Sequence, residues 1–333
     1  MDPSRQTQAS LSVLPDDVFI SLADIEAARV RIAPYVRQTP VLTSEVLDQA
    51  SGGQLFFKCE NLQAIGAFKA RGASNAVLSL SDADAARGVA THSSGNHGSA
   101  VAYAARLRGI PAYVVMPEGV ARPKAAQVER LGGRITYCAP TIAAREAAAA
   151  KVMAETGAVL IHPYDDLAVM AGQATAALEL IDETSVLDIV MTPVGGGGLI
   201  SGVSTATKAR LPAARVIGAE PAGADDAARS FRAGRLIPLD HANTIADGLR
   251  GSLSPATFAH IRRGVDEIVT VSEAAIVGAM RSIWEALKVV IEPSAAVPYA
   301  AILEGKVDVR GQHVGIVLTG GNVDLDRLPW VVG

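Results

Sequence analysis

Four consecutive glycines, Gly195–Gly198, stand between an apolar run (residues 186–191) and a helix-like stretch that begins at Leu199. Glycines at a strand-to-helix junction leave backbone N–H groups bare at a helix N-terminus, where these groups and the helix dipole favour an anion. Val203 stands where a P-loop needs lysine, and Ile200 where a dinucleotide fingerprint needs glycine. The pattern therefore predicts a loop for the phosphate of another cofactor.

A lysine, Lys69, follows the turn at Gly66 and opens a second helix-like stretch, residues 68–80. The positive end of the helix dipole disfavours a charged amine there, and a surface lysine packed on Phe68 is one interpretation. The same location lowers the pKa of a functional lysine, and a neutral amine forms a Schiff base with an aldehyde. Together with a phosphate loop, this indicates pyridoxal phosphate.

Short β-rich runs alternate with alanine-rich stretches of helical period, which indicates an α/β fold with parallel sheets flanked by helices. The predicted strands are residues 54–59, 88–91, 112–116, 134–138, 159–161, 187–192, 215–219, 267–271 and 313–318. The predicted helices are residues 68–80, 97–107, 124–131, 142–155, 169–182, 199–211 and 273–287.

Composition and charge are typical of a soluble α/β enzyme. A length of 333 residues predicts two domains, and 49% hydrophobic but only 4% aromatic residues predict an aliphatic interior. A net charge of −4 argues against binding to nucleic acid or to an anionic membrane. Cys59 and Cys138 lack metal-ligand spacing and are expected to be reduced thiols. The sequence shows no signal peptide and no membrane span, so a cytoplasmic location is expected.

The stretch from Lys58 to Gly72 resembles the cofactor-lysine motif of the fold-type-II pyridoxal-phosphate enzymes, the two-domain fold of tryptophan synthase β. It is most similar to the group of serine racemases, serine/threonine dehydratases and threo-3-hydroxyaspartate dehydratases. The resemblance covers about residues 35–325 and continues in the family's order through residues 91–98, 171–173, 195–198, 220–226, 244–248, 291–293 and 319–322.

The resemblance implies a role for each residue of the cofactor site. Lys69 would bind the cofactor covalently and act as a base on one face of the substrate Cα. The phosphate would be bound by Gly195, Gly196, Gly197 and Gly198. Phe68 would pack against the ring, Asn96 would contact the ring hydroxyl, and Thr319 would face the pyridine nitrogen.

The same resemblance implies a substrate loop made of Ser93, Ser94, Asn96 and His97, which would receive the substrate carboxylate. His97 is equally well interpreted as a histidine that stabilises the start of its helix. Ser94 would return a proton on the face opposite Lys69, as racemisation requires; the alternative is that it caps the helix. Arg145 would bind a second carboxylate, with Arg250 as another candidate cation.

A divalent cation is implied by a segment that resembles the family's metal loop. Its ligands would be the carboxylates of Glu220 and Asp226 and the carbonyl of Ala224. Oxygen ligands suit Mg²⁺ or Ca²⁺, with Mn²⁺ as a third candidate. This assignment competes with a ribose-binding role for Glu220, which a nicotinamide-dependent oxidoreductase would require.

The predicted reaction is pyridoxal-phosphate-dependent β-elimination from L-serine, L-threonine or threo-3-hydroxyaspartate, which yields a 2-oxo acid and ammonia, with a racemase side activity. A racemase, a nicotinamide-dependent oxidoreductase and a catalytically silent homologue are the alternatives. The large domain is expected to comprise residues 1–87 and 166–333, and a small mobile domain residues 88–165, in a homodimer. Ala64 replaces a lysine that lies near the nucleotide effector in animal relatives, which argues against activation by ATP.

Overall fold

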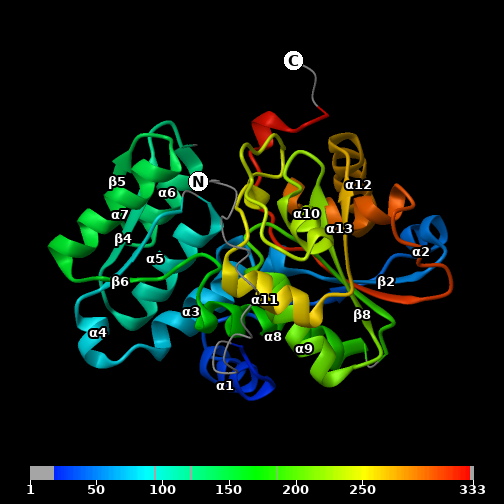
Figure 1. Cartoon of the computed structure of the whole chain (residues 1–333), viewed down its shortest axis with the longest axis horizontal. Helices are drawn as coiled ribbons and strands as arrows, with labels where there is room; N and C mark the ends of the chain where they lie inside the picture. Colours follow the sequence, from blue (N-terminus) through cyan, green and yellow to red (C-terminus); the bar gives the residue numbers. More distant parts are fainter. Residues whose placement is uncertain (1–18, 94, 121, 185, 331–333) are drawn as a thin grey trace, which may run out of the picture.

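The strands of the computed structural model form two sheets, each with helices on both faces (Figure 1). The structure describes residues 19–93, 95–120, 122–184 and 186–330. The larger sheet has the order β1 (Val41–Leu42), β2 (Gln54–Lys58), β10 (His313–Val317), β7 (Ile189–Pro193), β8 (Arg215–Pro221) and β9 (Glu267–Val271). The smaller sheet has the order β5 (Arg134–Cys138), β4 (Ala112–Pro117), β3 (Val89–Thr91) and β6 (Val159–Leu160).

All described strand pairs are parallel except β1 with β2, which confirms the predicted fold class. The short edge strand β1 escaped prediction because two residues carry no periodicity. The helices are α1 (Leu22–Ile32), α2 (Glu45–Ser51), α3 (Lys69–Ser79), α4 (Asp82–Ala86), α5 (Asn96–Arg108), α6 (Arg122–Arg130), α7 (Ile142–Thr156), α8 (Leu167–Thr184), α9 (Gly198–Arg210), α10 (Asp226–Ala233), α11 (Pro255–Gly264), α12 (Glu273–Leu287) and α13 (Pro293–Leu303).

Six of these helices, α1, α2, α4, α10, α11 and α13, were not among the predicted ones. Helix α13 is buried along nearly its whole length and contains Pro298, so it shows no polar face from which a helical period could be recognised. Helices α1 and α11 begin with capping boxes at Ser21 and Ser254, a local signal that the sequence did contain.

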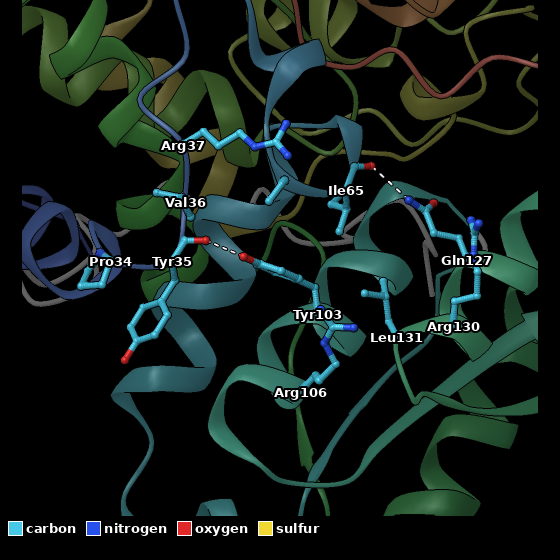
Figure 2. Close-up of a pocket in the computed structure, with 11 residues that line it drawn as sticks. Pro34, Tyr35, Val36, Arg37, Ile65, Tyr103, Arg106, Gln127, Arg130 and Leu131 are labelled. Carbon is cyan, nitrogen blue, oxygen red and sulfur yellow. Dashed lines mark hydrogen bonds between the residues drawn. The ribbon is translucent and has the colours of Figure 1, made fainter.

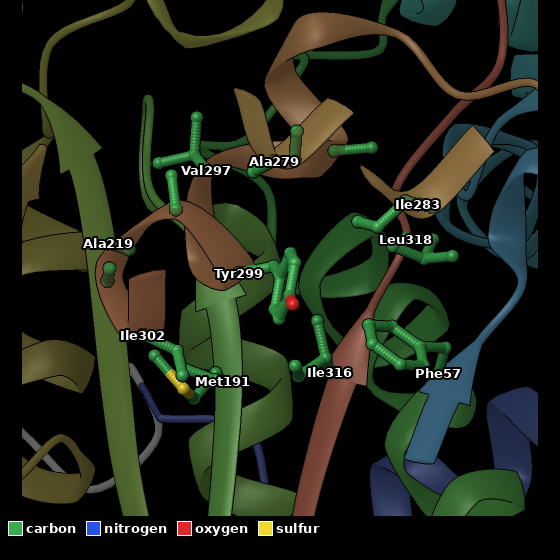
Figure 3. Close-up of a cluster of buried hydrophobic side chains, with 14 of the residues drawn as sticks. Phe57, Met191, Ala219, Ala279, Ile283, Val297, Tyr299, Ile302, Ile316 and Leu318 are labelled. Carbon is green, nitrogen blue, oxygen red and sulfur yellow. The ribbon is translucent and has the colours of Figure 1, made fainter. Parts of the chain in front are cut away.

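The larger sheet buries both of its faces. Helices α12 and α13 pack on one face, where Phe57 of β2 meets Tyr299 of α13 edge-to-face with ring centroids 6.1 Å apart (Figure 3). Helices α1, α8 and α9 pack on the other face. Strands covered on both sides must be apolar throughout, and the side chains of β7 are all buried.

Loops at the carboxyl ends of the parallel strands carry most of the predicted site residues, as is usual for open α/β sheets. The glycines follow β7, Thr319 follows β10, and Ser93 follows β3. Hydrogen bonds from Lys69 to the carbonyl of Pro163 and from Asn96 to Glu292 show that the loops of the two sheets meet. None of the helices in the described ranges is long and apolar enough to cross a bilayer.

Candidate active site

Lys69 is the first residue of α3, and its position is set from the larger sheet. The N–H of Phe68 donates to the carbonyl of Thr319 at 3.0 Å, which ties the start of the helix to the segment after β10. Lys69 Nζ donates to the carbonyl of Pro163 at 2.7 Å. Burial lowers the pKa of Lys69 from 10.5 to about 8, so the neutral amine becomes accessible close to neutral pH.

A buried ion-pair network holds α3 in place two residues beyond Lys69. Arg71 Nε donates to Glu60 Oε2 at 2.7 Å, and Arg71 Nη1 donates to Glu179 Oε1 at 2.7 Å. Lys58 Nζ lies 2.8 Å from Glu179 Oε2. Burial opposes the charge of Arg71, but Glu60 and Glu179 outweigh it and raise its pKa. The motif residues Lys58, Glu60 and Arg71 therefore position the helix that carries Lys69.

The four glycines form a turn between β7 and α9 that side chains could not enter. Gly197 has φ of +86°, in the region that favours glycine. A Cβ at Gly196 would lie 2.2 Å from a ring carbon of Tyr164, and one at Gly198 would lie 2.9 Å from the Tyr164 Cα. The N-cap of α9 is Gly197, with no side-chain cap. These features fit a phosphate, which would be held by backbone N–H groups and the dipole of α9.

The residues predicted to contact the cofactor ring lie in one polar cluster. Thr319 Oγ1 is buried without a hydrogen-bond partner in the described protein, which fits a hydroxyl reserved for a ligand atom such as a pyridine nitrogen. Asn96 Nδ2 donates to Glu292 Oε1 at 2.9 Å, and Asn96 Oδ1 accepts from Asn322 Nδ2 at 2.8 Å. Burial raises the pKa of Glu292 to about 7, and Asp247 acts in the same direction.

The substrate loop is described on both sides of Ser94, and Ser94 itself lies outside the described residues. Ser93 is partly buried and its Oγ accepts from the N–H of Gly95 at 3.4 Å. His97 is buried, with Nε2 3.0 Å from the carbonyl of Ile161 and Nδ1 buried without a partner in the described part of the chain. A carbonyl accepts only, so Nε2 carries the proton and Nδ1 is an acceptor. The neutral ring is thus poorly suited to bind a carboxylate through Nδ1, and the alternative of a helix-start histidine gains support.

The two candidate cations for a second carboxylate differ in their surroundings. Arg145 lies partly buried in the first turn of α7, near enough to lower the pKa of His92. Arg250 is exposed, and its Nη2 donates to the carbonyl of Thr244 at 2.7 Å. The guanidinium of Arg250 is already hydrogen-bonded within its own loop. The geometry therefore favours Arg145 as the cation for a second carboxylate.

Glu220 and Asp226 lie at the carboxyl end of β8 and the start of α10 and are both buried. Glu220 Oε2 accepts from the N–H of Ala228 at 2.7 Å, and Asp226 Oδ2 accepts from the N–H of Leu253 at 3.1 Å. Asp226 Oδ1 is buried without a partner among the described residues. That oxygen fits a cation ligand, although no group of three His, Cys, Asp or Glu side chains gathers anywhere in the described chain.

A pocket of about 510 Å³ that Lys69 does not line lies between the segment before β1 and helices α5 and α6 (Figure 2). Three arginines, Arg37, Arg106 and Arg130, line it together with Ala64. Two of its lining residues are hydrogen-bonded to each other: Gln127 Nε2 donates to the carbonyl of Ile65 at 3.2 Å. The expectation that Ala64 argues against nucleotide activation stays a prediction.

Several contacts of the site were not foreseen from the sequence. The carbonyl of Pro163 and the ring of Tyr164 come from the loop after β6, and Glu292 comes from the N-cap of α13. Glu292 belongs to residues 291–293, one of the segments that resemble the family, so the sequence did contain a signal for it. Pro163 offers only backbone, and nothing in a sequence marks a carbonyl as a lysine acceptor.

A glycine cradle at a helix N-terminus, a buried lysine of lowered pKa and a threonine hydroxyl without a partner in the described protein, carried by two mainly parallel β-sheets, define a fold-type-II pyridoxal-phosphate enzyme. The family model described as "Pyridoxal-phosphate dependent enzyme" matches residues 32–320. The chain belongs to this family.

The chain is similar to curated dehydratases and racemases over nearly its whole length. It is 53% identical over 307 residues to the beta-hydroxyaspartate dehydratase of Paracoccus denitrificans (strain Pd 1222), covering 92% of this chain and 98% of that protein. It is 51% identical over 312 residues to the serine racemase of Arabidopsis thaliana, covering 92% and 94%. The structure of maize serine racemase superposes with a TM-score of 0.90 at 47% identity, covering 92% and 94%. The protein is thus an enzyme of the dehydratase and racemase group.

Proposed function

We propose that this enzyme dehydrates and deaminates threo-3-hydroxyaspartate. The reaction removes the β-hydroxyl as water, and hydrolysis of the resulting enamine yields a four-carbon 2-oxo dicarboxylate and ammonium, so water is released and then consumed. The observation that carries the proposal is Arg145, a partly buried cation of α7 whose charge lowers the pKa of His92 in the loop after β3, because a β-carboxylate needs a cation and a β-methyl group does not. The 53% identity to a beta-hydroxyaspartate dehydratase supports it.

The proton transfer at Cα, and the orientation of the groups that take part in it, can be given to residues of the chain. Lys69, whose pKa is lowered by burial to about 8, removes the Cα proton in its neutral form. Pyridoxal phosphate, when bound, supplies the electron sink for the negative charge that develops at Cα. The carbonyl of Pro163 orients the Lys69 amine, and Thr319 offers a neutral hydroxyl to the ring nitrogen. A neutral partner leaves that nitrogen largely unprotonated, which favours elimination over transamination.

Racemisation is the second candidate activity. Its support is the Ser93-Ser94-Gly95-Asn96 sequence together with the 51% identity to a serine racemase. Under this proposal Ser94 moves a proton on the face opposite Lys69.

Motion and assembly complete the proposal. Residues 88–165 are proposed to move as a small domain against residues 1–87 and 166–333, which would exclude water while the enamine forms. The ion pair between Lys124 and Asp247 connects these two parts. The homodimer and the cytoplasmic location stay predictions.

Assays of 2-oxo acid release from β-hydroxy amino acids, in both configurations at the β and α carbons, test the substrate. We expect kcat/KM for one threo-3-hydroxyaspartate isomer to exceed that for L-serine by about 10- to 100-fold, which is the value of one charge-assisted hydrogen bond. An Arg145→Gln variant should lose most of this preference. An equal or higher kcat/KM for serine in the wild-type enzyme would redirect the proposal to a serine dehydratase.

We also propose a structural divalent cation at Glu220, Asp226 and the Ala224 carbonyl. Burial raises the pKa of Glu220 well above its usual value, and it raises that of Asp226 from 3.8 to about 6. Without a cation, the folded protein therefore favours protonated carboxylates and loses stability as the pH rises through about 6. A cation needs the ionised forms, so its stabilising effect is present above this pH and disappears below it.

At about pH 8, the protein in chelator should melt about 5 °C below the protein in a cation concentration of 100 times Kd. At about pH 5 chelation should have little effect, since the carboxylates are then protonated. Glu220→Ala should remove the response to added Mg²⁺ or Ca²⁺, whereas the exposed Glu155→Ala should keep it. A melting temperature that ignores chelator at both pH values would contradict the site.

A further inference from the structure

The loop between β6 and α8 contacts both the lysine and the glycines of the proposed cofactor site. The carbonyl of Pro163 accepts from Lys69 Nζ at 2.7 Å. The next residue, Tyr164, packs on the glycine turn, since a Cβ at Gly196 would lie 2.2 Å from its ring and one at Gly198 would lie 2.9 Å from its Cα. The position of this loop therefore affects the amine and the glycine turn together.

Asp165, the residue after Tyr164, connects this loop to the other sheet. Ser254 Oγ donates to Asp165 Oδ1 at 2.6 Å, and Ser254 is only 9% exposed. Ser254 is the N-cap of α11, the helix that leads into β9 of the larger sheet, whereas β6 belongs to the smaller sheet. This hydrogen bond thus joins segments of the two sheets beside the glycine turn.

The hydroxyl of Ser254 uses both of its hydrogen-bonding functions. Its oxygen accepts from the N–H of Thr257 at 3.1 Å, as an N-cap does. Thr257 Oγ1 donates its own proton to the carbonyl of Ser254 at 3.2 Å. An ionised carboxylate only accepts, so the single proton of the Ser254 hydroxyl points to Asp165. Hydrogen bonds to an ionised group are among the strong ones, which suits a contact that fixes a loop.

The start of α11 also packs on the glycine turn. A Cβ at Gly197 would lie 2.8 Å from Thr257 Cβ and 2.8 Å from Leu253 Cδ2. The glycine turn is therefore in contact with Tyr164 and with the first residues of α11. The hydrogen bond between Asp165 and Ser254 ties these two neighbours to each other. Without it, the ring of Tyr164 would be free to move away from the glycines.

We propose that Asp165 is a positioning residue for cofactor binding. It acts through its neighbours: the bond from Ser254 holds the ring of Tyr164 on the glycine turn and the carbonyl of Pro163 at the amine of Lys69. The phosphate loop and the lysine are thereby kept at the separation that one cofactor molecule spans. The inference rests on the proposed function, because it assumes that the glycine turn binds a phosphate.

Cofactor binding to the full-length, cofactor-free protein tests the inference without turnover. Pyridoxal phosphate and pyridoxal, which lacks the phosphate, are each titrated and followed by the absorbance of the bound ligand. The wild-type protein should prefer pyridoxal phosphate. Asp165→Ala should raise Kd for pyridoxal phosphate by about tenfold or more, the value of one charge-assisted hydrogen bond. Kd for pyridoxal should rise less, so the preference for the phosphate should shrink.

Helix α12 offers a matched control away from the glycine turn. Ser272 is its N-cap, and the Ser272 hydroxyl donates to the carboxylate of Glu304. Ser272→Ala and Glu304→Ala therefore remove the same kinds of contact as Ser254→Ala and Asp165→Ala, and should lower the melting temperature to a similar extent. They should leave Kd for pyridoxal phosphate unchanged. This comparison separates positioning of the cofactor site from general stability.

Two further variants test the hydrogen bond itself. Asp165→Asn keeps an acceptor for the Ser254 hydroxyl and should retain most of the affinity for pyridoxal phosphate. Ser254→Gly removes the hydroxyl while glycine remains a tolerated N-cap, and it should reproduce the rise in Kd even if Asp165→Ala does not fold. Combining Ser254→Gly with Asp165→Ala should raise Kd less than about twofold beyond either change alone, because both remove one bond.

A preference for pyridoxal phosphate that Asp165→Ala and Ser254→Gly leave at the wild-type level would overturn the inference and leave the phosphate loop standing. Independent, additive losses from the two changes would also overturn it. Equal wild-type affinities for pyridoxal and pyridoxal phosphate would refute the phosphate loop, and the inference with it.

Discussion

Lys69→Ala is expected to lower turnover by more than about 10⁴-fold, the upper end of what a positioned base contributes alone. The variant loses both the covalent attachment of pyridoxal phosphate and the base on one face of Cα. The phosphate cradle at Gly195–Gly198 remains, so the cofactor should still bind non-covalently. Mass spectrometry after borohydride treatment should find the cofactor mass on the wild-type chain and none on the variant.

Lys151→Ala is the control for this experiment, because Lys151 is an exposed lysine of α7 with its side chain 76% accessible. It should keep both the borohydride adduct and full turnover. Normal turnover by Lys69→Ala would contradict the proposed active site. Loss of turnover with an intact adduct would place the cofactor on another lysine.

Ser94→Ala is expected to separate the two faces of the reaction. The Cα–H bond must stand perpendicular to the cofactor plane, so each base reaches the hydrogen of one enantiomer only. Racemisation, and elimination from D-configured substrates, should fall by about 10²- to 10⁴-fold, whereas elimination from L-substrates by Lys69 should persist. Chiral chromatography of serine and 2-oxo acid assays measure both rates in one reaction mixture.

Ser282→Ala, at a partly buried position of α12 outside the proposed site, is the matched control and should change neither rate. Equal loss of both activities in Ser94→Ala, with normal cofactor content, would make Ser94 a helix cap or a carboxylate ligand. The enzyme would then be a simple dehydratase. This expectation rests on the sequence motif, because Ser94 lies outside the described residues.

The fold class could be predicted because its signals are local in sequence. Each strand of a parallel sheet is a short apolar run, and each connecting helix shows a 3.6-residue period. All nine predicted strands exist in the structure, within a residue or two at their ends. Helix α13 and the edge strand β1 had no such period, because one is buried on all sides and the other is two residues long.

The chemical core of the site was likewise visible in the sequence. A run of four glycines indicates a backbone segment that has no room for side chains. In the structure the ring of Tyr164 occupies the space that a Cβ at Gly196 would need. Lys69 stands at a helix N-terminus by virtue of the glycine turn before it. Such features depend on a few consecutive residues, so they can be recognised in the sequence alone.

The sequence by itself determined the parallel α/β architecture and indicated Lys69 and Gly195–Gly198 as the proposed cofactor lysine and phosphate loop, because these follow from local periodicity and residue type. Tertiary structure alone decided that Arg71 is neutralised by Glu179 more than 100 residues away, and that His92 faces His162 across two strands. It also decided that the amine of Lys69 meets the carbonyl of Pro163. Long-range contacts of this kind depend on strand order and register, and burial then sets the pKa values at the positions where the two sheets meet.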